Sequence, residues 1–352
     1  LTRCLFITGK LAERSVRRVL GDTAPQLGID HDVAVLPITV AALMHTEWVR
    51  RKLTVNKQYD RAILPGWCQG DLEMLSQTFG VPFERGPKDV RELSVYLGAA
   101  QRSPPDTSAY DIEILAEINH APQLTDEQVV AAARRYRDSG ADVIDLGCIP
   151  GESWSRAGEV TELLRAEGFR VSIDSFDRAE VEAAVSAGAE LVLSVNRSNL
   201  DWAIGLAAEL VAIPDTPQQL DSLAATVDEL RSRGRRIRID PIIEPIGCGF
   251  ATSLARYYEA RRRWPDIPML MGVGNITEMA EVDSAGVSLV LAALCQELDI
   301  RSVLTTEVIN WASSAVREFD IARRLVKHAI DHGTPAKHLD SKLVLLRDPQ
   351  VQ

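Results

Sequence analysis

The feature that most constrains the fold is an alternation of strand and helix patterns that repeats after residue 110. Short apolar segments typical of strands recur at 112–118, 142–146, 170–173, 191–195, 209–213, 236–239, 267–271 and 302–306. Helical patterns lie between most of them, and in the first, over 127–136, Val129, Val130 and Ala133 share an apolar face. Several strands are almost wholly apolar, as strands buried on both faces are. Eight such units in roughly 220 residues predict an α/β fold, a (β/α)₈ TIM barrel, with an open doubly wound sheet as the alternative.

A shorter alternation precedes the barrel segment. Strands are expected at 5–7, 33–36 and 62–64, and helical patterns run through Leu20, over 39–53 and over 71–79. This order predicts a small N-terminal parallel α/β domain of the Rossmann type. The stretch 101–108 contains Ser, Pro and Asp and is typical of a linker. We therefore place the N-terminal domain at 1–100, the linker at 101–110 and the barrel at 111–340.

Gly9 and Lys10 stand between the first strand and the first helix. A Gly-Lys pair at that position could form an anion-binding nest with its backbone amides. The spacing of a Walker motif is absent, so a plain strand–helix turn is favoured.

Composition and charge exclude several classes of protein. Hydrophobic residues make up 46% and charged residues 25%, as in ordinary globular proteins. The net charge is -11 and there is no long basic run, so no nucleic-acid partner is expected. No apolar run approaches the roughly 20 residues of a membrane span, so no membrane partner is expected. The five cysteines are scattered, which predicts neither a zinc site nor a disulfide framework but a cytoplasmic protein with reduced thiols.

Polar side chains follow strand after strand in the barrel segment. The successive ends carry Asn119, Asp145, Asp174, Asn196, Asp240, Gly272 to Asn275, and Thr305 to Glu307. One such residue alone is more often a turn or helix cap. Because the carboxyl ends of barrel strands converge on one mouth, their recurrence predicts a polar site there. Carboxylates and carboxamides suit a flat heterocycle, since a carboxylate accepts two parallel N–H bonds from an amino-pyrimidinone edge.

A series of short motifs then identifies a resemblance over about 112–332. In order, these are GADVIDLG at 140–147, GES at 151–153 and SRAG at 155–158, VSIDS at 171–175, AGA at 187–189 before Asn196, and DP at 240–241 before GCGF at 247–250. The order and content resemble those of dihydropteroate synthases. The resemblance implies a barrel enzyme that binds a reduced pterin.

The resemblance also implies roles for individual residues. Asp174, Asn196 and Asp240 would hold the pyrimidine edge of the pterin. Asn119 corresponds to an asparagine near the diphosphate and magnesium, which makes it the candidate magnesium ligand. Arg156 corresponds to an arginine that helps bind the leaving diphosphate.

The remaining mouth residues complete the candidate site. Asp145, Gly272 and Thr306 are taken as further substrate-binding positions. Asn119, His120 and Asn275 are the candidate catalytic residues. Histidine as a residue type titrates near neutral pH, so His120 is considered as a general acid or base, with packing at the mouth as an equally weighted alternative.

Three segments depart from the synthase pattern. Synthases carry Ser-Arg-Lys after the seventh strand, whereas this chain has Gly274-Asn275-Ile276, which resembles the Ser-Asn loop of methyltransferases that move a methyl group from a reduced folate to a corrinoid. The eighth strand ends in Thr305-Thr306-Glu307 in place of an Arg-x-His anion site. The loop at 119–122 lacks the synthase Thr-Pro-Asp-Ser-Phe sequence.

The whole layout also resembles dihydropteroate synthase-related proteins linked to tetrahydromethanopterin and one-carbon metabolism. We therefore expect a transferase of tetrahydromethanopterin or folate-type cofactor biosynthesis, which joins a hydroxymethyl-dihydropterin unit to an aryl amine. The alternatives are a methyltransferase of the methyltetrahydrofolate–corrinoid type, which needs a corrinoid protein as partner, and a pterin-binding protein without catalysis. A homodimer is the expected assembly.

Overall fold

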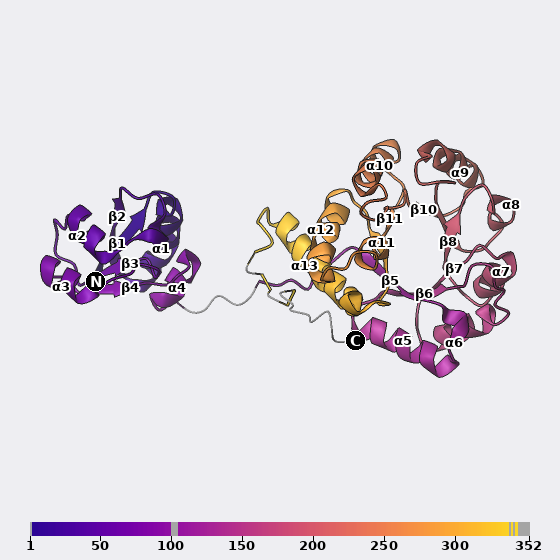
Figure 1. The fold of residues 1–352 in the computed structure, drawn as a ribbon, viewed down its shortest axis with the longest axis horizontal. Helices are drawn as coiled ribbons and strands as arrows, with labels where there is room; N and C mark the ends of the chain where they lie inside the picture. Colours follow the sequence, from indigo (N-terminus) through magenta and orange to yellow (C-terminus); the bar gives the residue numbers. More distant parts are fainter. Residues whose placement is uncertain (1, 100–104, 338, 341, 344–352) are drawn as a thin grey trace. The chain divides into compact units, whose positions relative to one another are not determined.

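The computed structural model describes residues 2–99, 105–337, 339–340 and 342–343 (Figure 1). The chain divides into two compact units, 1–104 and 105–352. Each unit has its own parallel sheet.

The N-terminal unit is a four-stranded parallel sheet in the order β2-β1-β3-β4. Its elements are β1 (Thr2–Gly9), α1 (Glu13–Leu27), β2 (Ile29–Leu36), η1 (Ala41–Leu43), α2 (Thr46–Lys52), β3 (Arg61–Leu64), α3 (Leu72–Phe79), β4 (Phe83–Arg85), η2 (Val90–Glu92) and α4 (Leu93–Tyr96). Side chains alternate across a strand, so Leu5 and Ile7 of β1 join one apolar cluster while Phe6 joins another. The sheet is thus buried on both faces.

The single helix predicted over 39–53 is wrong. The chain forms the short η1, becomes extended at Met44 and His45, and starts α2 at Thr46. The Thr46 N–H donates to the carbonyl of Gln69 over 2.9 Å, and the Gln69 N–H donates to the carbonyl of Met44 over 3.2 Å. Pairing with a distant segment replaces helical bonds here, and a local pattern does not reveal such a partner. The short elements β4 and α4 were not predicted.

The turn at Gly9 and Lys10 does not form an anion nest. The amide N–H of Lys10 donates to the carbonyl of Ile38 over 2.9 Å, and that of Leu11 donates to the carbonyl of Thr39 over 3.2 Å. These two amides hold the loop after β2 and are not available to an anion.

The second unit is a parallel barrel of eight strands, each followed by helices on the outside (Figure 1). The strands are β5 (Glu113–Ile118), β6 (Val143–Gly147), β7 (Val171–Asp174), β8 (Leu191–Val195), β9 (Glu209–Ala212), β10 (Ile237–Ile239), β11 (Leu270–Gly272) and β12 (Ser302–Thr305). Hydrogen-bonded pairs run from β10 back to β5 and on through β12 to β11, and a bridge between Ile239 and Met269 joins the two ends. The prediction of a (β/α)₈ barrel behind a small parallel α/β domain is confirmed.

Helices and short turns cover the barrel. They are η3 (Ala121–Gln123), α5 (Asp126–Asp138), α6 (Ala157–Ala166), α7 (Arg178–Ser186), α8 (Leu200–Ala203), α9 (Leu220–Ser232), α10 (Phe250–Arg263), α11 (Gly274–Thr277), α12 (Ser284–Glu297), η4 (Asn310–Ala312) and α13 (Ala315–Asp331). In α5, Thr125 and Gln128 form a capping box, while Val129 and Ala133 are buried as predicted. None of the described helices is long and apolar enough to cross a membrane.

The lumen of the barrel is filled, so the site has to lie at an end. Leu115, Val143 and Leu193 belong to a cluster of inward-facing apolar residues. At the amino ends of the strands, Arg238 bridges two carboxylates, with Nη1 2.5 Å from Glu113 and Nε 3.1 Å from Glu209. This ion network closes that end, and the carboxyl ends remain as the place for a ligand.

Residues 105–112 form neither helix nor strand, yet they pack on the barrel unit. The Arg323 guanidinium lies 3.6 Å from the centre of the Tyr110 ring, and the Tyr110 hydroxyl donates to Asp142 over 3.2 Å. The Asp106 carbonyl lies 3.1 Å from Nδ1 of His328. Of the linker predicted at 101–110, residues 101–104 lie outside the described residues. Residues in 105–110 contact the surface of the barrel unit.

Candidate functional site at the barrel mouth

Three carboxyl groups stand on consecutive strands near the mouth, and we call Glu117, Asp145 and Asp174 the acidic triad. Register explains their proximity, because Glu117 of β5 lies opposite Asp145 of β6, and Asp145 lies opposite Ser172 of β7. The Ser172 hydroxyl donates to Oδ1 of Asp145 over 2.6 Å. The other oxygen of Asp145 is buried and has no hydrogen-bond partner among the described residues. Asp174 ends β7 two residues later, on the same side as Ser172.

Burial raises the pKa of every member of the acidic triad, and the charges of neighbouring members add to this for Asp145 and Asp174. Burial, followed by the charges of Asp174 and Glu117, raises the pKa of Asp145 well above its ordinary value. Burial and then the charge of Glu117 raise the pKa of Asp174 to about 7. Burial is also the main cause that raises the pKa of Glu117. Asp174, whose pKa is raised to about 7, can therefore exchange a proton with a ligand near neutral pH.

Glu117 was not predicted as a site residue. It lies under the mouth, and its Oε1 accepts a hydrogen bond from Nδ2 of Asn119 over 3.3 Å. Gly147 makes room for it, since a Cβ built there would lie 2.4 Å from Oε1 of Glu117. The available sequence signal was the second of two acidic residues in a mainly apolar strand, two positions before Asn119.

Asp240 forms a second acidic position, across the barrel at the end of β10. Its Oδ1 accepts hydrogen bonds from the hydroxyl of Tyr257 and from the N–H of Ile242, the latter over 2.7 Å. Burial raises the pKa of Asp240 to about 6, although these two bonds and the charge of Arg256 oppose the shift. Tyr257 comes from the outer helix α10, and no local pattern marks it. It leaves Oδ2 of Asp240 as the oxygen available to a ligand.

Gly272 sits beneath the space between Asp240 and Asn275. A Cβ at Gly272 would lie 4.0 Å from Oδ2 of Asp240 and 3.6 Å from Nδ2 of Asn275. The Asn275 amide donates one hydrogen bond to the carbonyl of Ile243 over 3.0 Å, which orients the carboxamide. The absence of a side chain at 272 lets a ligand approach both groups.

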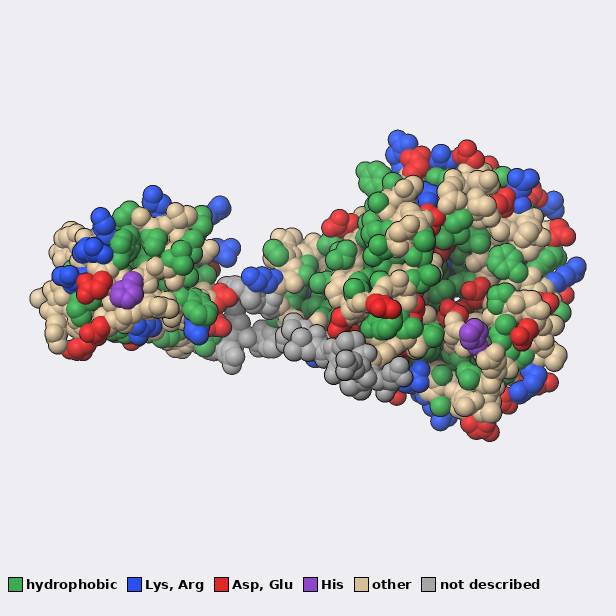
Figure 2. All heavy atoms as spheres, in the orientation of Figure 1, with side chains coloured by type: hydrophobic (Ala, Val, Ile, Leu, Met, Phe, Trp, Pro, Cys, Tyr) green, Lys and Arg blue, Asp and Glu red, His purple; other side chains and the backbone are tan. Residues whose placement is uncertain are grey.

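Two cavities open at the mouth, and Glu117 lines both of them. One, of about 460 Å³, lies between the loops after β6 and β7 and includes Gly147 and Asp174. The other, of about 410 Å³, lies at the ends of β5, β11 and β12; it is lined by Asn119, His120, Gly272, Asn275 and Thr306, among others. Figure 2 shows the barrel unit hollowed near its centre, with acidic side chains in the hollow. Each cavity is large enough for a small heterocycle.

Hydrogen bonds position several of the residues that line the second cavity. The Thr306 hydroxyl lies 3.5 Å from the carbonyl of Glu117, and Thr306 itself is buried. His120 is exposed and adopts a left-handed conformation with φ of 52°. The carboxylate of Glu278, also not predicted, accepts the N–H groups of Val308 and Ile309 over 3.1 and 3.0 Å. These bonds fix the loop after β12 as one wall.

Asn196 and Arg156, two of the predicted binding residues, line neither cavity and are engaged elsewhere. The Asn196 side-chain oxygen accepts hydrogen bonds from the N–H and hydroxyl of Ser198 over 2.9 and 2.6 Å, so it caps its own loop. Arg156 precedes α6 at the surface, where it pairs with Asp126 at 2.7 Å and Glu159 at 3.1 Å. Of the other predicted residues, Asn119, His120, Gly272, Asn275 and Thr306 line the second cavity and Asp174 lines the first, while Asp145 and Asp240 lie at their strand ends without lining either cavity.

A metal site at Asn119 lacks an assembled set of ligands. In the described portion of the chain, no group of three or more His, Cys, Asp or Glu side chains is arranged to hold a metal ion. Asn119 supplies one oxygen and its amide nitrogen is bonded to Glu117. We derive no catalytic step through magnesium.

Sequence comparisons show two similarities. The model of a family of unknown function, DUF6513, matches residues 2–88. The uncharacterised protein MJ0107 of Methanocaldococcus jannaschii is 25% identical, and the match covers 100% of this chain and 79% of that protein.

Solved structures show a similarity in fold. Dihydropteroate synthase of Yersinia pestis, solved with a pterine-sulfa conjugate, aligns with a TM-score of 0.50 and 19% identity over 64% of this chain and 96% of the synthase. The synthase of Thermus thermophilus, solved with 6HMPPP, aligns with a TM-score of 0.50 and 18% identity over 63% and 95% of the respective chains. The chain therefore contains the fold of dihydropteroate synthases.

Proposed function

We propose that the barrel mouth binds a reduced pterin and that the protein is a transferase of pterin cofactor biosynthesis. The supporting observation is the arrangement of Asp174 and Asp240, two raised-pKa carboxyl groups at the ends of β7 and β10, with the Asn275 carboxamide beside Asp240. Such groups suit the alternating donors and acceptors of a pterin edge. The likeness in fold to dihydropteroate synthases supports the same ligand.

The proposed reaction joins a hydroxymethyl-dihydropterin unit to an aryl amine that carries a ribose phosphate, as a step toward a tetrahydromethanopterin-type cofactor. The amine nitrogen attacks the exocyclic methylene carbon, a C–N bond forms, the C–O bond to the leaving group breaks, and the amine gives up a proton. The protein contributes mainly position and charge. His120 is the only His, Lys or Arg side chain in the described lining of the two cavities, and its proposed role is to donate a proton or a hydrogen bond to the departing oxygen.

The second candidate is a pterin-dependent methyltransferase. Neither cavity is lined by Lys or Arg among the described residues, whereas a synthase has to stabilise a diphosphate. Asn275 occupies the loop whose sequence resembles the methyltransferases, and its side chain reaches the space above Gly272. In this reaction the methyl group passes from the pterin ring nitrogen to a corrinoid held by a partner protein.

The two functions are separable by product analysis. Purified protein is incubated with hydroxymethyl-dihydropterin diphosphate and candidate aryl amines, and separately with a methylated reduced pterin and free cobalamin. We expect a condensed pterin–amine product, lost in Asp174→Asn and kept in the surface control Asp126→Asn. Methyl transfer would support the second candidate, and pterin binding without either product would show a protein that binds without catalysis. Absence of pterin binding by calorimetry would refute the site.

A further inference from the structure

The N-terminal unit contains a cavity that the barrel chemistry does not use. In its sheet, β1 lies between β2 and β3. The connection from β1 to β2 therefore runs to one side of β1, and the connection from β2 crosses to β3 on the other side. Open parallel sheets bind ligands at such a switch point, outside the carboxyl ends of the strands. A cavity of about 420 Å³ opens there, lined by the ends of β1 and β3 and by the loops after β2 and β4.

Close backbone approaches hold the walls of this cavity. A Cβ at Gly66 would lie 2.6 Å from the carbonyl oxygen of Gly86 and 2.6 Å from the nitrogen of Lys88, so the loops after β3 and β4 touch. A Cβ at Gly9 would lie 2.8 Å from the carbonyl oxygen of Ile38. The loops are therefore packed on one another, and the cavity is a preformed feature of the unit.

The lining is mostly apolar, and parts of it stand open to water. Leu11 is 71% exposed, Trp67 is 53% exposed and Val40 is 41% exposed, and all three line the same cavity. Leaving large apolar side chains in water forgoes burial energy, and such clusters mark binding sites. An indole ring beside aliphatic walls favours a flat aromatic molecule.

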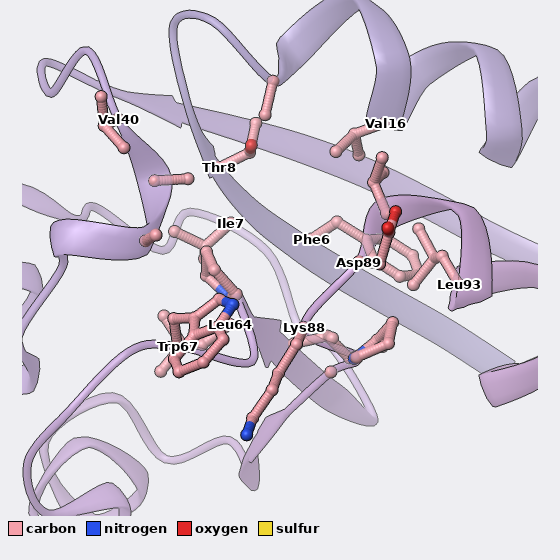
Figure 3. A pocket seen from close by; sticks show the side chains of 18 of the residues that line it. Phe6, Ile7, Thr8, Val16, Val40, Leu64, Trp67, Lys88, Asp89 and Leu93 are labelled. Atoms are coloured by element: carbon pink, nitrogen blue, oxygen red, sulfur yellow. The ribbon is translucent and has the colours of Figure 1, made fainter. Parts of the chain in front are cut away.

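Two polar groups in this lining have no polar partner among the described residues. Lys88 places Nζ 4.3 Å from the centre of the Trp67 ring and has no carboxylate partner among the described residues, while the adjacent Asp89 is engaged elsewhere. Thr8 is 2% exposed, and its hydroxyl makes no hydrogen bond within the part of the chain described. In Figure 3 the Lys88 side chain extends past Trp67 and away from Thr8, which lies on the opposite side of the view. The ammonium beside Trp67 matches an anionic group, and the Thr8 hydroxyl is a separate polar position in the lining.

The loop geometry selects among anions. A phosphate at a strand–helix turn is usually held by several backbone amides. Here the amides of Lys10 and Leu11 donate to Ile38 and Thr39 instead. A carboxylate needs fewer donors than a phosphate, and the Lys88 ammonium can supply its charged partner.

We propose that this cavity binds a small flat aromatic carboxylate. Its ring lies against Trp67 and the aliphatic wall, and its carboxylate accepts a hydrogen bond from the Lys88 ammonium beside that ring. This site is independent of the pterin site proposed for the barrel.

The test uses the full chain and the probe 2-naphthoate, with 2-naphthamide as the neutral match and cyclohexanecarboxylate as the non-aromatic match. Calorimetry should show saturable binding of 2-naphthoate. Lys88→Met should weaken 2-naphthoate about tenfold and leave 2-naphthamide unchanged, because only the charged hydrogen bond is lost. Trp67→Leu should weaken both aromatic probes about fivefold. Lys10→Met, which removes a lysine outside the lining, should change neither.

Several results would overturn the proposal. They are no saturable binding of 2-naphthoate at millimolar concentration, equal binding of cyclohexanecarboxylate, or equal loss in Lys10→Met and Lys88→Met. Loss of 2-naphthoate binding in Asp174→Asn would place the probe in the barrel and also refute the assignment. Melting curves of each variant confirm that the exposed substitutions leave the fold intact.

Discussion

Single carboxyl groups determine how the barrel mouth responds to pH. The pKa of Asp174 is raised to about 7 and that of Asp240 to about 6, with burial as the first cause in both. The negative charge of Glu117 raises the pKa of Asp174 further, and Asp145 is the third member of the acidic triad. A carboxyl group whose pKa is raised in the folded state binds its proton more tightly there than in the unfolded chain. The stability that this proton gives to the fold is therefore present at low pH and is lost as pH rises toward about 7. When ionised, these buried carboxyl groups lower the stability of the folded state. Such a cost is expected of side chains whose role is to bind a ligand.

Pterin affinity should therefore rise as pH increases through about 7, because only the ionised Asp174 accepts two N–H bonds. In Asp174→Asn the affinity should fall by about tenfold or more at pH 8, since a charge-assisted pair of bonds is lost. The remaining rise should centre near 6, the pKa of Asp240. Calorimetric titrations with a reduced pterin between pH 5 and 8 measure both effects.

Glu117→Gln is the matched control for this assignment. The substitution removes a neighbouring negative charge and keeps the shape, so the midpoint for pterin binding should move to lower pH. A pH-independent affinity in the unmodified protein, or an unmoved midpoint in Glu117→Gln, would contradict the proposed coupling.

Asn275 distinguishes the two proposed reactions. In the synthase reaction the reacting carbon lies outside the ring, so Asn275→Ala should raise the apparent pterin constant and change turnover little. In the methyltransferase reaction the carboxamide would act on a ring nitrogen whose charge changes, and turnover should fall by about 10²–10³ with little change in affinity. We expect the first outcome, measured by steady-state kinetics.

A purely local role for Asn275 has its own signature. Its amide bonds the carbonyl of Ile243, so loss of that bond alone would lower the melting temperature and leave both kinetic constants unchanged. A melting curve of the same variant separates this result from the other two.

At the scale of elements, the strand β6 shows how a glycine supports an acid on its neighbour. Gly147→Ala would place a Cβ 2.4 Å from Oε1 of Glu117, and this flexible carboxylate has to move. We expect weaker pterin binding with a small change in melting temperature, because the shift occurs at the end of a side chain.

The control variant for Gly147→Ala is Gly286→Ala in α12, where a Cβ would meet nothing within 4 Å. It should raise stability by about 1 kcal/mol through helix propensity and leave pterin affinity unchanged. Equal pterin affinity of Gly147→Ala and the unmodified protein would show that Glu117 does not shape the site.

At the scale of the whole molecule, we propose that the barrel is an independent domain and that it begins at Pro105. A fragment from Pro105 retains the contact of Tyr110 with Arg323 and that of Asp106 with His328, whereas a fragment from Glu113 loses both. The longer fragment should melt in one transition and bind the pterin, and the shorter one should melt several degrees lower. Identical melting temperatures of the two fragments would show that residues 105–112 do not belong to the domain.

The alternation, the barrel and most of the polar mouth residues are predictable from the amino-acid sequence, because strand burial and strand ends leave local signals. Tertiary structure alone decided which acids meet. Register placed Glu117 opposite Asp145, and the helix α10 brought Tyr257 to Asp240. It also placed Arg156 in surface ion pairs and used the Asn196 oxygen to cap a loop. In the N-terminal unit, the break at His45 and the cavity beside Trp67 arise from pairing and strand order, which join residues distant in the chain. A local pattern carries no information on such contacts.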